Sequence, residues 1–180
     1  MQRILLCIGG AVVLAACHSK PSVNEKNATI EQVAESLRKA SDNGKFMRPG
    51  EWISSVTVDE ISMPGLPAEA QRALKNGAGQ VRTMQSCLTQ QDAKQPPVQF
   101  LAGNDQCRYD HFTMSHGKID AKMRCSAHGA GETIVMTGTY SPTSYQMTMQ
   151  SNTDAPTGQG IAMRMHVEAK RTGECTAKGS

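Results

Sequence analysis

The stretch "TIVMTGTYSPTSYQMTMQ", residues 133–150, decides the fold. Apolar and polar side chains alternate on both sides of residues 141–144, a pattern typical of two antiparallel strands joined by a tight turn. A turn there pairs Tyr140 with Tyr145, Gly138 with Met147 and Met136 with Met149. The stretch therefore predicts a hairpin with one buried face and one solvated face.

The following segment, "IAMRMHVEA" (161–169), continues this alternation and predicts a third strand. The shared apolar face would carry Ile134, Met136, Tyr140, Met147, Met149, Ile161, Met163, Met165 and Val167. The opposite face would carry Thr137, Thr139, Gln146, Thr148, Gln150, Arg164, His166 and Glu168. A period of two over three segments indicates a half-buried antiparallel sheet.

Earlier in the chain, "EWISSVTVDEISM" (51–63) predicts another strand. Ile61 and Met63 fall on the face opposite to Val56, so we expect a bulge near Asp59–Glu60 that restores them to one side. Two helices are also expected. One opens at Thr29 with a capping box completed by Gln32 and ends at Asn43–Gly44, and the other covers residues 67–76 and closes at Gly77.

These pieces predict a mainly β (α+β) fold. We expect a curved or partly closed antiparallel sheet, with one or two helices toward its N-terminal side. Lys and Arg number 19 against 16 Asp and Glu, and the two signs are interspersed. Such a balance does not create the positive electrostatic potential that attracts nucleic acid, so we expect no nucleic-acid partner.

The N-terminus resembles an export signal. One positive charge precedes an apolar run from Ile4 to Leu14, which is shorter than the ~20 residues that a membrane span needs. The tetrad 14–17, "LAAC", resembles the lipobox of bacterial lipoproteins. That resemblance implies cleavage before Cys17 and acylation of its thiol and its new amine. An ordinary signal cut after Ala16 is the alternative.

The expected organisation has three parts: a signal peptide over residues 1–16, a lipidated tether over 17–28, and one disulfide-stapled β-rich domain over 29–180. Because His18 rather than an aspartate follows Cys17, we expect the periplasmic face of the outer membrane. The membrane would then be a partner through the lipid on Cys17.

Two disulfides are expected from the six cysteines. Cys7 lies inside the signal and Cys17 would be acylated, which leaves an even set in an oxidising compartment. Four thiols allow three connectivities, and their wide spacing disfavours zinc. A hairpin in residues 107–125 with a three-residue loop at 115–117 would place Met114 opposite Lys118. Cys107 then faces Cys125, and Cys87 is left for Cys175.

The chain resembles a family of exported proteobacterial proteins, domain of unknown function 3617. The resemblance rests on "RPGEW" (48–52), "QSCLTQQDA" (85–93), the cysteines 107 and 125, "GTY" (138–140) and "RTGEC" (171–175). It implies an exported, disulfide-containing, β-rich domain, and it implies no catalytic residues.

The methionines are the most suggestive candidate site. Met147, Met149, Met163 and Met165, with His166 beside them, resemble the thioether and imidazole sets that bind Cu(I). They share a face with isoleucine and valine, however, and methionine is a flexible core filler. Alternation also points His166 the other way. We therefore expect core residues, no metal and no cofactor, and keep Cu(I) as a remote alternative.

No pattern in the sequence predicts an enzyme. The chain has no G-x-S-x-G motif, and His111, His116 and His128 lack metal-ligand spacing. We expect a non-catalytic structural or interaction module of the cell envelope. The alternative is a binder of a small lipophilic ligand in the apolar face of the sheet. A cavity of several hundred cubic ångströms lined by the methionine face would favour the binder.

Overall fold

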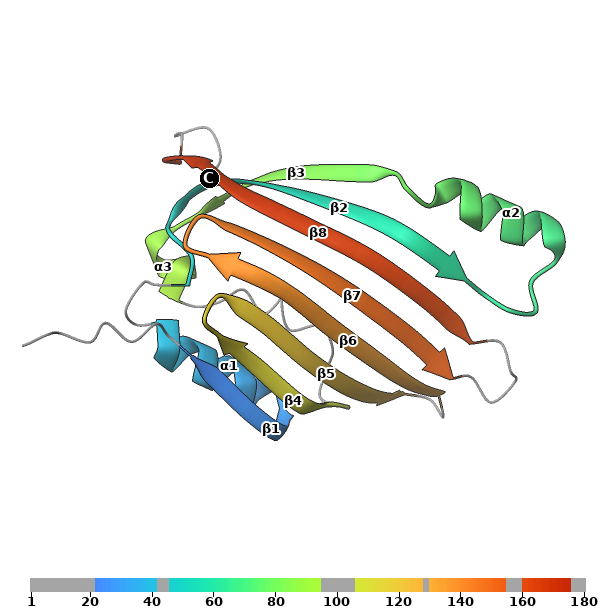
Figure 1. The fold of residues 1–180 in the computed structure, drawn as a ribbon, viewed down its shortest axis with the longest axis horizontal. Coiled ribbons are helices and arrows are strands. Elements are labelled where there is room, and N and C mark those ends of the chain that lie inside the picture. Colours follow the sequence, from blue (N-terminus) through green and yellow to red (C-terminus); the bar gives the residue numbers. More distant parts are fainter. Residues whose placement is uncertain (1–21, 42–45, 95–105, 128–129, 155–159, 176–180) are drawn as a thin grey trace, which may run out of the picture.

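The described chain is built on one eight-stranded antiparallel sheet. The structure, a computed structural model, describes residues 22–41, 46–94, 106–127, 130–154 and 160–175. The strand order is β1-β4-β5-β6-β7-β8-β2-β3, so β1 and β3 are the edges (Figure 1). The strands are β1 (Val23–Thr29), β2 (Gly50–Ser62), β3 (Val81–Leu88), β4 (Cys107–Ser115), β5 (Lys118–Ala127), β6 (Ala130–Ser141), β7 (Ser144–Asp154) and β8 (Ile161–Gly173). The mainly β fold with an antiparallel sheet is confirmed.

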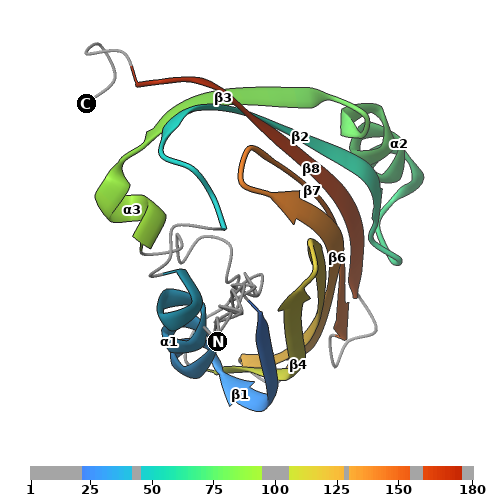
Figure 2. The ribbon, with the colours of Figure 1, turned by 60° about the vertical axis from the view of Figure 1, so that its left-hand side comes forward.

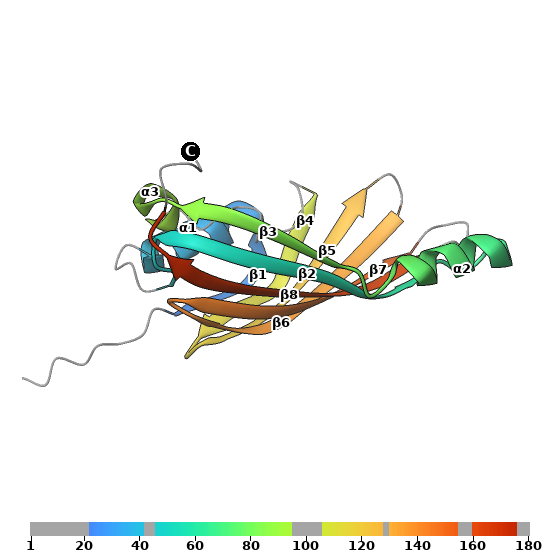
Figure 3. The same ribbon diagram turned by 90° about the horizontal axis from the view of Figure 1, so that it is seen from above.

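The sheet curls into an open trough with helices at its mouth. The described residues form α1 (Ile30–Ser41), α2 (Ala68–Gly77) and α3 (Gln90–Lys94). Figure 2 shows α1 inside the curve beside β1 and β4, and α3 across the opening at the end of β3. Figure 3 shows the strong twist between β2 and β5, with α2 projecting beyond β2 and β3. We call the side that holds α1 the concave face.

Helix α1 begins as its sequence predicts. The backbone N–H of Thr29 donates to Gln32 Oε1 at 2.8 Å, and that of Gln32 donates to Thr29 Oγ1 at 3.2 Å. This reciprocal pair is the capping box. Val33 and Leu37 are buried on one stripe of the helix, which covers the concave face near β1 and β4. The predicted end at residues 43–44 lies outside the described residues.

The tether prediction is wrong from Val23 onward. Residues 23–29 form β1, which pairs with β4 and places Val23 opposite Met114 and Ala28 opposite Tyr109. Both Val23 and Ala28 are 3% exposed, so this strand belongs to the core. Val23 and Ala28 are an odd number of residues apart, yet both face the core, because Asn27, with a φ of 49°, interrupts the alternation of faces between them. The interruption hides the strand in the sequence.

The β4–β5 hairpin reaches the predicted disulfide by a different register. Ser115 pairs with Lys118, so the loop has two residues, His116 and Gly117, both with positive φ. Such a two-residue turn suits a twisted hairpin. A register shift between Tyr109 and His111 then offsets the shorter loop by one residue. The three-residue loop is therefore wrong, and the pairing of Cys107 with Cys125 is confirmed.

The β6–β7 hairpin has the predicted register, and β8 extends the meander as expected. Tyr140 pairs with Tyr145, and Met136 with Met149. Gly138 lies opposite Met147, and a Cβ at position 138 would collide with the backbone oxygen of Gln146. Glycine therefore lets β6 and β7 approach closely in the middle of the sheet.

Strand β2 lies between β8 and β3 and carries the predicted bulge. Its register with β8 shifts between Val58 and Glu60, after which Ile61 pairs with Met163. Val58 pairs with Met165, so both apolar residues of β2 face the concave side. Strand β3 and helix α3 have no counterpart in the prediction. Most of β3 is exposed, which removes the alternation that would have revealed it.

The buried core occupies only one half of the trough. It gathers side chains of α1, β1, β4, β5, β6 and the adjoining part of β7, among them Tyr109, Met123, Met136 and Met147. On the concave side of β8, β2 and β3, only Trp52 and Ala169 are buried among the described hydrophobic residues. The sheet thus continues beyond the helix that covers it, and its apolar face continues with it.

Candidate functional site

A groove lies on the concave face where the core ends. It encloses about 430 Å³ and is formed mainly by β2, β3, β7 and β8. Most of its wall is apolar. Its lining residues are Met47, Trp52, Ser54, Val56, Met84, Gln85, Ser86, Leu88, Tyr145, Met147, Met149 and Val167. The volume lies within the range of about 300–1,000 Å³ that is common for small-molecule pockets.

Trp52 is the anchor of the groove. It is 2% exposed, and its indole Nε1 donates a hydrogen bond to the Arg48 carbonyl at 3.1 Å. Its ring lies 6.2 Å from that of Tyr145, measured between centroids. The indole therefore contributes an apolar surface whose polar atom is already satisfied.

Tyr145 and Ser54 supply polar groups in the groove. Burial raises the pKa of Tyr145 above its ordinary value, and a hydrogen bond with the Ser54 side chain opposes that shift. The phenol is thus neutral at physiological pH. Because the hydroxyls of Tyr145 and Ser54 bond to each other, the groove meets a ligand mainly as an apolar surface.

The methionines divide between the core and the open face. Met147 is 6% exposed and belongs to the core, as predicted. Met149 is half-buried against the core and lies opposite Met165. Met163 and Met165 are half-buried outside the core, so the core prediction is wrong for these two. It fails because α1 covers only part of the face that the alternation defines.

The structure does not bring His166 to the methionines. His166 Nε2 lies 3.1 Å from Glu168 Oε1 on the convex face, whereas Met149 and Met165 face the concave side. The thioether and imidazole groups are therefore separated by the sheet. Within the described ranges, no group of three or more His, Cys, Asp or Glu side chains could hold a metal ion.

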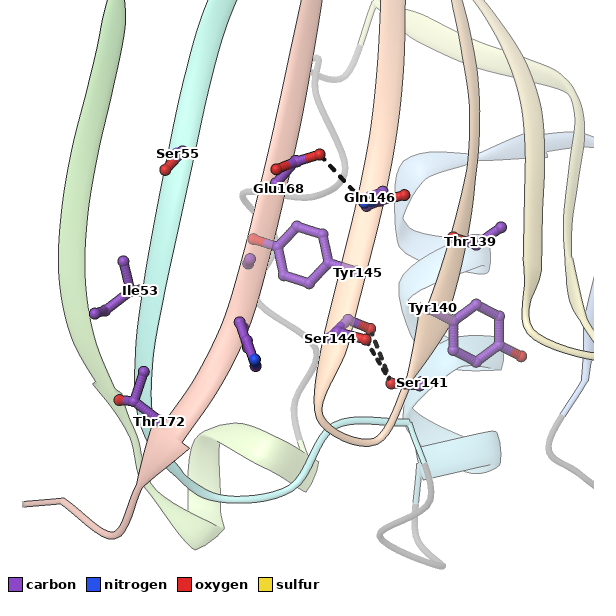
Figure 4. Close-up of a pocket in the computed structure, with 12 residues that line it drawn as sticks. Ile53, Ser55, Thr139, Tyr140, Ser141, Ser144, Tyr145, Gln146, Glu168 and Thr172 are labelled. Atoms are coloured by element: carbon purple, nitrogen blue, oxygen red, sulfur yellow. Dashed lines mark hydrogen bonds between the residues drawn. The ribbon is translucent and has the colours of Figure 1, made fainter.

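A second hollow lies on the convex face at the β6–β7 turn (Figure 4). Its volume is about 590 Å³, but the side chains along its strands are mostly polar, and two pairs of them bond to each other. Gln146 donates to Glu168 at 3.2 Å, and the hydroxyls of Ser141 and Ser144 are 2.8 Å apart. Because this surface is open and its polar groups already bond to each other in part, it is a weaker ligand site than the apolar groove.

Tyr109 carries a polar atom that the described part of the fold leaves unsatisfied. Its side chain is fully buried against Phe112, with ring centroids 5.4 Å apart, and its hydroxyl has no hydrogen-bond partner among the described residues. Burial raises the pKa of Tyr109 to about 12. The residue belongs to the core beneath α1, not to the groove lining.

Comparison with known proteins identifies the family. The model of the family described as "Protein of unknown function (DUF3617)" matches residues 47–175, which is well over half of the chain. The chain belongs to this family. No curated protein and no solved structure matches the chain. The DUF3617 match leaves the molecular role to be argued from the groove itself.

The DUF3617 motifs at the two ends of the matched region meet at one end of the groove. Arg171 of "RTGEC" donates from Nε to the Pro49 carbonyl of "RPGEW" at 2.6 Å. Gly50 lies so close that a Cβ there would collide with Gly173 and Arg171. These motifs hold the segment that carries Trp52 in place. A structural role therefore accounts for them, and no catalytic role is needed.

The two disulfides fix both sides of the trough. Cys87 and Cys175, with Cα atoms 5.5 Å apart, join edge strand β3 to the end of β8, and this predicted pairing is confirmed. Cys107 and Cys125 join β4 to β5 within the core. No helix in the described part of the chain is long and apolar enough to cross a membrane.

Proposed function

We propose that this protein is an exported envelope lipoprotein that binds a small lipophilic ligand in the concave groove. One observation carries the proposal. The apolar face of the sheet extends past α1 and forms a walled groove of about 430 Å³. A structural module would gain more stability from a filled interior, since buried apolar surface contributes about 25 cal/mol per Å².

The shape of the apolar surface favours an elongated ligand. The groove runs along the strands from Leu88 and Trp52 at one end to Val56 and Val167 at the other. Each buried methylene of a bound chain would contribute about 0.8 kcal/mol. Methionine walls suit such a ligand because their unbranched side chains adapt to different shapes.

The proposed location rests on the tetrad that ends at Cys17 and on the two disulfides. Disulfides persist in oxidising compartments, which agrees with export. With β1 beginning at Val23, a lipid on Cys17 would keep the domain within about 20 Å of the membrane. A groove for lipophilic molecules would then work next to their source.

Quenching of Trp52 fluorescence tests ligand binding. Trp52 is the only tryptophan of the chain and lines the groove. Fatty acids brominated in mid-chain should quench its emission saturably, because bromine in the groove would lie within the short range over which it quenches indole. The unbrominated acid should compete. Absence of saturable quenching would contradict the proposal and favour an interaction module.

A matched pair of β3 variants supplies the control. Met84 is 57% exposed and lines the groove, so Met84→Gln should weaken binding without unfolding the protein. Thr83 is its exposed neighbour on the opposite face, and Thr83→Gln should bind like the wild type. Equal affinity of the two variants would place the ligand elsewhere.

A further inference from the structure

Arg82 lies at the rim of the groove on the concave face of edge strand β3. It pairs with Val56, and Met84 pairs with Ser54. Val56, Met84 and Ser54 all line the groove. Because residues two apart on a strand share a face, the exposed Arg82 side chain lies beside this apolar wall.

Arg82 has no carboxylate within ion-pair distance among the residues that the structure describes. Glu168, opposite Ser55, accepts from Gln146 on the convex face. Asp59 and Glu60 lie three and four residues beyond Val56 on β2, and neither forms an ion pair with Arg82. A positive charge thus borders an apolar groove without a negative partner.

Arg171, near the opposite end of the groove, is already engaged. Its Nε donates to the Pro49 carbonyl at 2.6 Å, and its terminal nitrogen bonds to Glu174. Arg171 therefore secures the support of Trp52 and is not free to bind a ligand. Arg48, exposed at the same end, precedes β2 and also lacks an ion pair among the described residues, whereas Arg82 stands on a strand that forms the groove wall. Its place on that wall assigns the head group to the Arg82 end.

We propose that the ligand is a single-chain amphiphile with an anionic head group, which Arg82 binds while the chain lies in the groove. A long-chain carboxylate is the simplest example. This inference rests on the proposed function and adds the chemical class and the orientation of the ligand. Guanidinium groups are well suited to carboxylate and phosphate oxygens because their donors form a planar fork.

The fold sets where along the chain Trp52 would contact such a ligand. Arg82 lies opposite Val56, and Trp52 lies four residues away on β2, a distance of about 13 Å at about 3.3 Å per residue. A head group at Arg82 therefore places the middle of an eighteen-carbon chain against the indole. The chain end would reach toward Met47 and Leu88.

The experiment compares two probes with the same chain, one with a charged head group and one with a neutral head group. Dibromostearic acid and dibromostearyl alcohol, brominated in mid-chain, are titrated at pH 8 below their aggregation concentrations, with Trp52 quenching as the readout. The wild type should bind the acid about two- to fivefold more tightly, as expected for a solvent-exposed ion pair. High salt should shrink this preference. Arg82→Gln should abolish it while leaving the affinity for the alcohol unchanged.

Controls separate this inference from the proposed function. Arg72→Gln, an exposed change on α2, should keep the preference for the acid. Equal affinity for acid and alcohol in the wild type would contradict the inference of an anionic head group, but it would still support ligand binding in the groove. No quenching by either probe would instead contradict the proposed function.

Bromine position checks the orientation. Mid-chain bromines should quench Trp52 more than bromines next to the carboxylate. Stronger quenching near the carboxylate, together with loss of the preference in Arg48→Gln rather than in Arg82→Gln, would place the head group at the opposite end. That result would overturn the role of Arg82.

Discussion

Gly50 lies directly against Arg171, close enough that a Cβ on Gly50 would sit 2.5 Å from the guanidinium Nε. Its φ of 140° is also one that other residues rarely adopt. Gly50→Ala should therefore lower the free energy of unfolding by about 1–3 kcal/mol, measured by urea denaturation. Gly131→Ala, where nothing lies within 4 Å of the added Cβ, should change it little. Similar losses in both variants would contradict the close-contact explanation.

The boundary of the core should appear in methionine truncations. Met147→Ala removes a buried side chain and should lower the free energy of unfolding by about 2–5 kcal/mol. Met163→Ala, on the same face but half-buried outside the core, should lower it by less than about 1 kcal/mol. Thermal melts of the two variants measure the difference. Equal losses would mean that the open half of the trough is as well packed as the other half.

Two tyrosines should respond oppositely to loss of the hydroxyl. Tyr109→Phe removes a buried hydroxyl that has no partner in the described ranges, so stability at pH 7 should be unchanged or higher. Tyr145→Phe removes the hydrogen bond to Ser54 and should lower the free energy of unfolding by about 0.5–1.5 kcal/mol.

The same Tyr109 variant predicts a pH dependence. The pKa of Tyr109 is about 12 in the folded protein and near 10 when unfolded, so the unfolded state loses its proton first. Stability from this group is fully present below pH 10 and is lost as pH rises from 10 to 12. Tyr109→Phe should weaken that alkaline loss in urea titrations. An identical pH profile in the variant would show that the phenol is not buried.

Copper should not stabilise the protein. Thermal melts with and without Cu(I), kept reduced by ascorbate so that the disulfides survive, should superimpose because His166 lies across the sheet from the methionines. A rise in Tm that Met149→Leu removes would make copper binding the leading function, since leucine has no lone pair to donate.

Membrane attachment should depend on Cys17. Cys17→Ala should release the protein from the membrane fraction and abolish acyl labelling, because the acyl chains supply the membrane affinity. Fractionation with radiolabelled or alkyne-tagged palmitate measures both. A wild-type protein that carries no acyl mass would rule out the lipid anchor.

The central hairpins were predictable because their turns and their alternation agree. In β6 and β7, a polar turn and a strict period of two fix the register without tertiary information. The pairing of Cys107 with Cys125 was right through two offsetting errors, a loop one residue too long and an unforeseen bulge at Asp110. The two one-residue shifts have opposite senses and cancel, so the cysteines stay opposite each other.

Edge strands and the groove could not be predicted in the same way. Strands β1 and β3 are the edges of the described sheet, and each departs from strict alternation, β1 at Asn27 and β3 through its mostly exposed side chains. The groove depends on where α1 ends over the curved sheet. Alternation shows which face is apolar, but not how much of that face a helix covers.

The insertion of β2 between β8 and β3 also sets the order of assembly. Pro49 and Arg171, which bond across this junction, are 122 residues apart in the chain. β2 and β3 can pair with each other early, yet neither can join the sheet until β8 is in place. Contacts this distant in sequence make folding slow. The apolar wall of the groove is therefore the last part of the sheet to be completed, and until then Trp52 and its neighbours are open to aggregation.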